Sequence, residues 1–176
     1  MTKLKTNLKY SIEFADKNDI DEVMILTEKI NQDLLSIGMT QWNNGYPNEE
    51  VYLKDISLNS MYKMLNEQGQ IIAIGSINKN QHPNFAEANW KDKSDTFRLI
   101  YRLGVDPEYQ NKGLAGVMMD YLENVAIKEK ATSIRLGALS TYEKVVNFYL
   151  KRNYSIQDKK GFPVSKSVYY LMEKIL

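Results

Sequence analysis

The chain has 176 residues, of which 43% are hydrophobic and 26% charged, and its 23 Lys and Arg residues against 22 Asp and Glu residues leave a formal net charge of +1. This length suits one domain with a full hydrophobic core, and the balanced charge argues against a general nucleic-acid-binding protein, which carries a basic excess on one face. The absence of cysteine excludes disulfides, thiol nucleophiles and thiolate metal sites, and the single histidine, His82, argues against a zinc site or a Ser-His-Asp triad. We therefore predict a single domain over residues 1–176 that holds no metal and binds no nucleic acid.

The sequence carries no recognisable signal for a membrane or for secretion. No apolar run approaches the roughly 20 residues that a membrane-spanning helix needs. The N-terminal residues 1–6 also lack the apolar core of a secretory signal peptide. We therefore expect a cytoplasmic protein that is not attached to a membrane.

The first half of the chain predicts a strand, two helices and a β-hairpin. Residues 10–14 alternate in the way of a half-buried strand, and apolar residues from Ile20 to Leu35 recur at the spacing that lines one face of a helix. Asp16 and Asp19 supply the polar side chains that start such a helix. In order, the expected elements are a strand at 10–14, a helix that ends at Gly38, a second helix at about 48–58, and a hairpin of strands 61–65 and 71–77.

The second half alternates strands and helices after a long polar segment. Residues 79–95 lack periodicity and contain Pro83, which predicts a loop of the length usually associated with function or mobility. The elements expected after this loop are a strand at 96–105, a helix from Gly113, a strand at 132–138, a helix at 142–152, and strands near 154–156 and 168–172. This order predicts a mixed α/β sheet covered on both faces.

The stretch between the strand at 96–105 and the following helix has the features of an anion site. Pro107 fixes the chain in a turn, and the first-turn N–H groups of the helix have no intrahelical partners. These donors and the positive end of the helix dipole suit a phosphate. Small residues at Gly113 and Ala115 would let the backbone approach it, and Lys112 would either add a charge or remain a solvated side chain.

Two motifs give this part of the chain a family resemblance. Residues 110–115 resemble the pyrophosphate-binding motif of the GCN5-related N-acetyltransferases (GNAT), which runs Arg or Gln, two residues, Gly, one residue, Gly or Ala. Residues 147–154 resemble the other signature of that family, a tyrosine on the next helix that precedes a Lys-Leu-Gly-Phe-type helix end. The order of elements over residues 10–174 is similar as well. The resemblance implies an α/β, single-domain GNAT-like fold whose mixed, mostly antiparallel sheet is flanked by helices on both faces.

The resemblance also implies acetyl coenzyme A (acetyl-CoA) as the acetyl donor. In the family, the motif holds the pyrophosphate, and the strand that corresponds to Leu103 and Val105 pairs with the pantetheine amides. Val105 should therefore contribute its backbone rather than its side chain. The residues expected to bind this cosubstrate are Leu103, Val105, Gln110, Asn111, Lys112, Gly113, Leu114 and Ala115.

Tyr149 is the residue expected to take part in the chemistry. Attack of an amine on a thioester expels a thiolate, and a phenol near the sulfur can protonate it. The matching tyrosine of the family has that role, so the resemblance implies direct transfer of acetyl to a primary amine with Tyr149 as general acid. The other reading, a core tyrosine on a helix face, stays open in a chain with 12 tyrosines.

Two positions depart from the family pattern. Many members have an asparagine that contacts the cofactor seven residues before the tyrosine, where this chain has Tyr142. Asn153 replaces the usual glycine at the helix end, where asparagine is tolerated because it adopts the left-handed conformation. No single general base stands out, and a water chain would also serve. The candidates for the base are Glu87, Asp92, Asp95, Tyr101 and Arg102.

Three aromatic residues are candidates for the acceptor site. Trp42 and Tyr46, with Pro47, resemble a Gln-Trp and Tyr-Pro segment of a subset of bacterial acetyltransferases, in a region that overhangs the acceptor in the family. We therefore predict an aromatic wall there, and a Trp42 that fills the core beneath the loop is the equal alternative. Tyr101, on the strand that leads to the phosphate-binding turn, is the third candidate.

Direct acetylation of a primary amine, on a small molecule or an amino terminus, is the leading hypothesis. A first alternative is a catalytically weak sensor or assembly domain that binds acyl-CoA, which Tyr142 and the missing base favour. A second keeps the enzyme and makes a protein N-terminus or lysine the acceptor. Many members of the family form dimers, so a homodimer is a further expectation.

Overall fold

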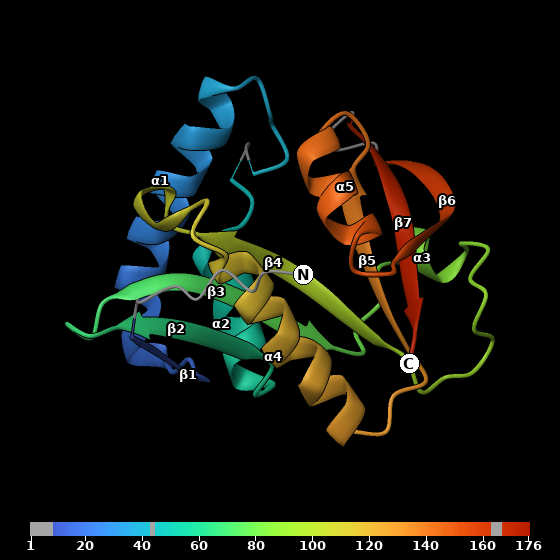
Figure 1. Ribbon diagram of the computed structural model, residues 1–176, viewed down its shortest axis with the longest axis horizontal. Helices are drawn as coiled ribbons and strands as arrows, with labels where there is room; N and C mark the ends of the chain where they lie inside the picture. Colours follow the sequence, from blue (N-terminus) through green and yellow to red (C-terminus); the bar gives the residue numbers. More distant parts are fainter. Residues whose placement is uncertain (1–8, 43–44, 163–166) are drawn as a thin grey trace. The chain divides into compact units, whose positions relative to one another are not determined.

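The computed structural model describes residues 9–42, 45–162 and 167–176 (Figure 1). The expectation for residues 1–6 lies outside the described residues, as does the middle of the predicted connector 41–47. Within the described part, the elements follow one another as β1 (Tyr10–Phe14), η1 (Lys17–Asp19), α1 (Ile20–Ser36), α2 (Glu49–Ser57), β2 (Met61–Asn66), β3 (Ile71–Asn78), α3 (Pro83–Ala86), β4 (Arg98–Val105), η2 (Pro107–Tyr109), α4 (Leu114–Lys128), β5 (Ser133–Leu139), α5 (Glu143–Leu150), β6 (Ser155–Phe162) and β7 (Ser167–Ile175).

The strands form a mixed sheet in the order β1-β2-β3-β4-β5-β7-β6. Four neighbouring pairs are antiparallel: β1 with β2, β2 with β3, β5 with β7, and β6 with β7. β4 and β5 are parallel, with Arg98 opposite Ile134 and Leu99 opposite Arg135. The predicted fold class, α/β with a mixed and mostly antiparallel sheet, is confirmed.

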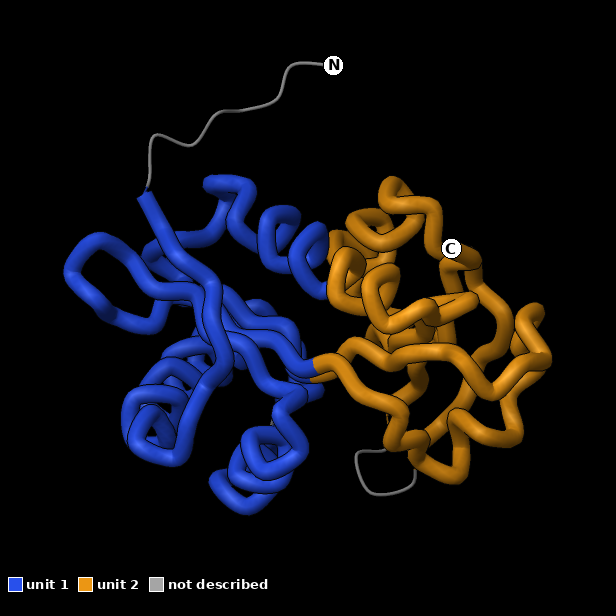
Figure 2. The backbone as a smooth tube through the Cα atoms, turned by 90° about the horizontal axis from the view of Figure 1, so that it is seen from below, with its two compact units in different colours: residues 1–76, 102–122 blue, residues 77–101, 123–176 orange. Residues whose placement is uncertain are grey.

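The chain divides into two compact units, which Figure 2 shows in blue and orange. The first comprises residues 1–76 and 102–122, and it contains β1, β2, most of β3, the end of β4, and helices α1 and α2. The second comprises residues 77–101 and 123–176, and it contains the start of β4, β5 to β7, α3 and α5. The predicted phosphate-binding turn belongs to the first unit and Tyr149 to the second.

Helices cover both faces of the strands in the first unit. A Cβ atom added to Gly75 of β3 would lie 2.9 Å from Leu122 and 3.6 Å from Met118, both on α4. The next residue, Ser76, donates its hydroxyl to Asp55 of α2 over 2.7 Å. Successive side chains of a strand point to opposite faces, so α4 and α2 cover opposite faces of β3 (Figure 1).

Local capping chemistry explains where the first helices begin. The Asp16 carboxylate accepts from the N–H of Asn18, and the Asp19 carboxylate accepts from the N–H of Asp16, which forms the predicted start before α1. Asn48 caps α2 by accepting from the N–H of Val51 over 3.0 Å. The buried residues of α1 share one face and confirm its predicted periodicity: Val23, Leu26, Thr27, Ile30 and Leu34.

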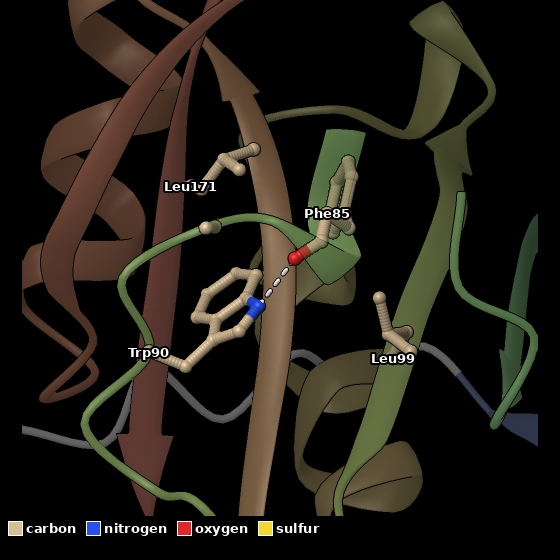
Figure 3. Packing of buried hydrophobic residues seen from close by; sticks show 5 residues of the cluster. Phe85, Trp90, Leu99 and Leu171 are labelled. Atoms are coloured by element: carbon tan, nitrogen blue, oxygen red, sulfur yellow. Dashed lines mark hydrogen bonds between the residues drawn. The ribbon is translucent and has the colours of Figure 1, made fainter. Parts of the chain in front are cut away.

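In the second unit, the segment predicted as a loop at 79–95 packs its aromatic side chains into the hydrophobic core. We call this segment the cover. It contains the short helix α3, and its side chains Phe85 and Trp90 are buried with Leu99 and Leu171 (Figure 3). The indole N–H of Trp90 donates to the carbonyl of Phe85 over 2.6 Å, so this hydrogen bond links two parts of the same segment. The expected lack of periodicity is correct, but the two large aromatic residues make this segment part of the core.

Strand β6 is longer than the sequence pattern suggests. A strand was expected near 154–156, whereas β6 runs from Ser155 to Phe162 and includes Gly161. It is the last strand in the sheet order, so one of its edges has no neighbouring strand among the described residues. Edge strands tolerate charged residues such as those at 158–160, so the charge there hides the strand from a search for alternation.

Candidate active site

The turn between β4 and α4 is held by a buried carboxylate. Asp106 is 4% exposed and accepts from the N–H of Glu108 over 2.9 Å and from the Lys29 ammonium over 3.1 Å. The N–H of Asp106 itself donates to the carbonyl of Ile72 on β3 over 2.9 Å. The turn is therefore fixed to both β3 and α1 before the chain enters α4.

Gly113 precedes α4, and its backbone conformation leaves the first N–H groups of the helix at the turn. Its φ of +81° is a left-handed conformation that favours glycine, and Asn111 has a φ of +59°. The N–H of Val117 donates to the Gly113 carbonyl over 3.1 Å. The N–H groups of Leu114 and Ala115 come before this bond, so they have no acceptor within the helix. This geometry has the features of the predicted anion site.

Two polar side chains of the motif brace the turn itself. The Gln110 amide donates to the Val105 carbonyl and to the Asp33 carboxylate, each over 3.3 Å. The Lys112 ammonium donates to the Glu108 carbonyl over 2.8 Å, so this lysine closes on its own turn. Backbone N–H groups, rather than these side chains, are therefore the donors that the turn offers to a phosphate.

The end of β4 presents alternate backbone groups to its two edges. Asp106 directs its N–H to β3, as described above. Because main-chain groups alternate along an extended strand, we expect Gly104 to face β3 as Asp106 does. Leu103 and Val105 then direct their N–H and C=O groups to the other edge, where the Val105 carbonyl already accepts from the Gln110 amide over 3.3 Å. These are the two residues whose backbone was expected to pair with the pantetheine amides.

The two aromatic residues of the predicted acceptor wall lie in different surroundings. Trp42 is 9% exposed, and a Cβ atom on Gly104 would lie 2.7 Å from its indole, so the ring fills the space that this glycine leaves. Tyr46 is 43% exposed, and its hydroxyl accepts from Arg102 over 3.0 Å. Of the two alternatives for Trp42, the structure favours the core, and Tyr46 alone keeps a surface for an acceptor.

A buried ion pair, which sequence reasoning missed, lies beside Tyr46. Asp55 on α2 accepts two hydrogen bonds from the Arg102 guanidinium and a third from Ser76. The Arg102 and Asp55 side chains are 9% and 5% exposed. One signal was available in the sequence, because Asp55 lies three residues from Tyr52 and therefore on the same, buried helix face.

Tyr149 lies on the buried face of α5 in the second unit. It is 7% exposed, and its ring makes edge contacts with those of Phe148 and Tyr154, at centroid distances of 5.2 and 5.7 Å. Burial raises the pKa of Tyr149 to about 12, although the positive charge of Arg152 acts in the opposite direction. The phenol therefore stays protonated at neutral pH, as a proton donor must.

A buried carboxylate distinguishes the neighbouring Tyr154 from Tyr149. The Tyr154 hydroxyl donates to Glu123 over 3.2 Å, and Glu123 also pairs with Arg152 and Lys174. Burial, and then the negative charge of Glu123, raise the pKa of Tyr154. Within residues 9–42, 45–162 and 167–176, the Tyr149 hydroxyl has no such bond. Of these two phenols, Tyr149 is the one not committed to a carboxylate.

The carboxylates considered as a general base differ in their surroundings. Burial favours a neutral Asp92, but hydrogen bonds from Thr132 and Ser94 outweigh it and hold the pKa of Asp92 well below its ordinary value. Glu87 and Asp95 are exposed. A carboxylate with so low a pKa binds a proton weakly, so Asp92 is a poor base.

The remaining two candidates are occupied by other partners. The Tyr101 hydroxyl donates to the carbonyl of Asn80, and its ring lies 6.3 Å from that of Phe85 in the second unit. Arg102 is paired with Asp55 in the first unit. Among the residues that the structure describes, no group of three or more His, Asp or Glu side chains is arranged to hold a metal ion.

Known proteins share this fold. The acetyltransferase of the GNAT family from Streptococcus agalactiae 2603 is 20% identical and has a TM-score of 0.79, over 97% of this chain and 99% of that one. The PaiA N-acetyltransferase from Thermoplasma acidophilum, solved with coenzyme A, is 15% identical with a TM-score of 0.74, over 96% and 99%. The protein yncA from Salmonella typhimurium, solved with its cofactor acetyl-CoA, is 17% identical with a TM-score of 0.67, over 95% and 94%.

The sequence itself gives the family. No curated protein matches the chain closely enough to serve as a relative. Within the described residues, none of the helices combines the length and apolar character needed to cross a bilayer. The model of the Acetyltransferase (GNAT) family matches residues 31–154, which is well over half of the chain. The expected resemblance is confirmed, and the chain belongs to the GNAT acetyltransferase family.

Proposed function

We propose that this protein transfers an acetyl group from acetyl-CoA to a primary amine by direct attack. The observation that carries the proposal is the turn at residues 110–115, where a left-handed Gly113 brings the free N–H groups of α4 to the end of a strand. Two structural neighbours, PaiA and yncA, are named with coenzyme A or acetyl-CoA. In this proposal the whole chain, with a core at about 10–174, is one acetyltransferase domain.

Backbone groups of the first unit would hold the donor. The N–H groups at the start of α4 suit the pyrophosphate, because those of Leu114 and Ala115 have no acceptor within the helix and Gly113 carries no side chain. The outward N–H and C=O groups of Leu103 and the N–H of Val105 suit the pantetheine amides, whereas the Val105 carbonyl already accepts from Gln110. Acetyl-CoA supplies an acetyl group activated as a thioester.

Tyr149 would donate the proton that the leaving group needs. The amine nitrogen forms a bond to the acetyl carbon, the carbon–sulfur bond breaks, and the Tyr149 hydroxyl protonates the departing thiolate. The resulting Tyr149 phenolate then regains a proton from water. Its raised pKa, about 12, keeps that proton available at neutral pH. The amine must lose a proton as well, and water is the acceptor that we favour, since Asp92 is a weak base and Glu87 and Asp95 are exposed.

Tyr46 and Tyr101 are the residues proposed for the acceptor side. Tyr46 offers an exposed ring whose hydroxyl is fixed by Arg102, which suits contact with the carbon skeleton of a small amine or an amino terminus. Tyr101 remains a candidate, although its hydroxyl is bonded to Asn80.

A cytoplasmic location and a homodimer are also part of the proposal.

Two measurements test this function. Isothermal titration with acetyl-CoA should give saturable binding, and no detectable binding at millimolar ligand would refute the proposal. Release of the coenzyme A thiol is then followed across a panel of primary amines and peptides with free amino termini. Release that depends on one class of amine identifies the acceptor and supports the enzyme.

A sensor domain is the second candidate. It is favoured by Tyr142, which stands at the start of α5 where many family members have an asparagine. A sensor would bind acetyl-CoA in the titration and release no thiol with any amine. The two measurements together therefore separate the enzyme from the sensor.

A further inference from the structure

Arg102 has a backbone conformation that is unusual inside a strand. Its φ is +51°, although it is a long L-residue within β4. Side chains crowd the backbone in this left-handed region, so such residues persist only where their surroundings enforce the conformation. The question is what enforces it here.

The side chain of Arg102 is held from three directions. Its Nε donates to Asp55 over 2.8 Å and its Nη2 to the same carboxylate oxygen, while Nη1 donates to the Tyr46 hydroxyl over 3.0 Å. Asp55 is fixed in turn by the Ser76 hydroxyl over 2.7 Å. We call these four residues the Arg102 network. It joins α2, β3, β4 and the connector before α2, all within the first unit.

The buried charges make this network rigid. Breaking one partner of a buried ion pair leaves the other charge without compensation, so each partner strongly resists leaving its place. The guanidinium is planar and its Nε and Nη2 both meet Asp55, which fixes the direction as well as the position of the side chain. The anchored guanidinium therefore restricts where the backbone of Arg102 can lie.

The left-handed conformation of Arg102 affects the residues that follow it in β4. A left-handed residue within a strand acts like the extra residue of a β-bulge, which bends the strand and offsets the alternation of the residues that follow. The next residues are Leu103, Gly104 and Val105. Leu103 and Val105 are the two that direct their backbone groups away from β3.

We infer that Arg102 is a positioning residue for the donor: its ion pair with Asp55 holds the left-handed turn that aims the backbone of Leu103 and Val105 at the amides of coenzyme A. This inference rests on the proposed function, because it assigns those backbone groups to the cosubstrate. Arg102 acts through the backbone and does not itself touch the ligand.

Two substitutions at Arg102 distinguish the effect of the left-handed backbone conformation from the effect of the positive charge. Arg102→Gly removes the ion pair, but glycine adopts a φ of +51° without strain, whereas Arg102→Ala removes the ion pair and also disfavours the turn. Titration of the full chain with coenzyme A should show binding weakened by roughly tenfold or more for Arg102→Ala, and restored to within about threefold of wild type for Arg102→Gly. Loss of the charge alone predicts equal losses in both.

A matched control comes from another buried cation of the same unit. Lys63 is 9% exposed and pairs with Asp19 over 2.7 Å. Lys63→Gln should lower stability and leave coenzyme A binding unchanged. If Arg102→Ala does not fold, Asp55→Asn takes its place: it should weaken binding in the wild-type background and have no further effect in Arg102→Gly, since glycine no longer needs the anchor.

The outcomes are distinct. Equal affinity in wild type and Arg102→Ala, or equal losses in Arg102→Ala and Arg102→Gly, would overturn the inference and leave the proposed function intact. In the substitute experiment, an effect of Asp55→Asn that persists in Arg102→Gly would do the same. Absence of coenzyme A binding by the wild type would overturn both.

Discussion

Gly104 shows how a single residue determines packing in the first unit. A Cβ atom at this position would lie 2.7 Å from the Trp42 indole and 2.7 Å from the Ile30 side chain. Real Cβ atoms do not approach neighbours this closely, so the glycine is required by the ring that fills its place. Trp42, which the sequence offered as either wall or core, is fixed in the core by this contact.

Gly104→Ala should therefore destabilise the protein by about 1–3 kcal/mol, because the added methyl group overfills a packed site. Urea unfolding of the full chain measures this loss. Gly161→Ala is the matched control, since a Cβ atom at Gly161 would meet nothing within 4 Å. Equal stability of Gly104→Ala and wild type would show that Trp42 moves aside easily and is not held in the core.

Tyr149 is the residue on which the chemistry is proposed to depend. Tyr149→Phe keeps the ring and its packing and removes only the proton donor. Turnover should fall by roughly 100-fold, within the range of general acid catalysis, while the affinity for acetyl-CoA stays within about twofold. Thiol release under saturating amine measures the first quantity and titration the second.

Tyr154→Phe provides the comparison for that experiment. It removes a phenol from the same cluster, but one whose hydroxyl is bonded to Glu123. We expect lower stability, because Glu123 loses a buried hydrogen bond, and a smaller effect on turnover than in Tyr149→Phe. If the two variants lose turnover equally, the acid role of Tyr149 is refuted in favour of packing.

At the scale of the element, the turn before α4 combines a backbone requirement with the proposed phosphate site. Gly113→Ala forces an alanine to a φ of +81°, which costs about 1–2 kcal/mol. The strain lies at the start of α4, so coenzyme A affinity should fall by at least about tenfold. Titration and urea unfolding of the same preparations measure both effects.

Gly38 makes this prediction specific to the turn. It has a φ of +77°, and a Cβ atom there would meet nothing within 4 Å. Gly38→Ala should thus lose about as much stability as Gly113→Ala, from the same backbone strain, without a change in coenzyme A affinity. Equal coenzyme A affinities in the two variants would show that the conformation of Gly113 is not needed for ligand binding.

The elements that could be predicted are those with local causes. The start of α1 follows from Asp16 and Asp19, and the end of α5 follows from Asn153, whose φ of +67° is the left-handed conformation expected there. The phosphate-binding turn is equally local. The cover at 79–95 was interpreted as a loop because polar residues dominate it, and only the burial of Phe85 and Trp90 reveals its role.

At the scale of the whole molecule, the features missed from the sequence are contacts between distant residues. Asp55 and Arg102 are 47 positions apart, and the buried pair Arg135 and Glu173 is 38 positions apart. No local pattern connects such residues, since each alone looks like an ordinary surface charge. The proposed donor site is therefore predictable from a local motif, whereas the buried ion pairs of the two units are not.

Because several tyrosine side chains are buried, the stability of the molecule should fall as the pH rises into the alkaline range. Burial raises the pKa of Tyr149 to about 12 and also raises the pKa values of Tyr52 and Tyr154, all from an ordinary value of 10. Each folded-state pKa lies above the unfolded one. The associated stability is therefore fully present below pH 10 and is lost as pH rises through the folded-state pKa, because the unfolded chain gives up its protons first.

The share of Tyr149 in this loss can be isolated. With pKa values of about 12 folded and 10 unfolded, wild type should lose about 1 kcal/mol of unfolding free energy between pH 9 and pH 11 from this group alone. Tyr149→Phe should lose less by that amount over the same interval, since phenylalanine does not titrate. Urea unfolding of both proteins at pH 9, 10 and 11 measures the difference. Parallel curves would mean that Tyr149 reaches solvent and titrates with its ordinary pKa, which would contradict its burial.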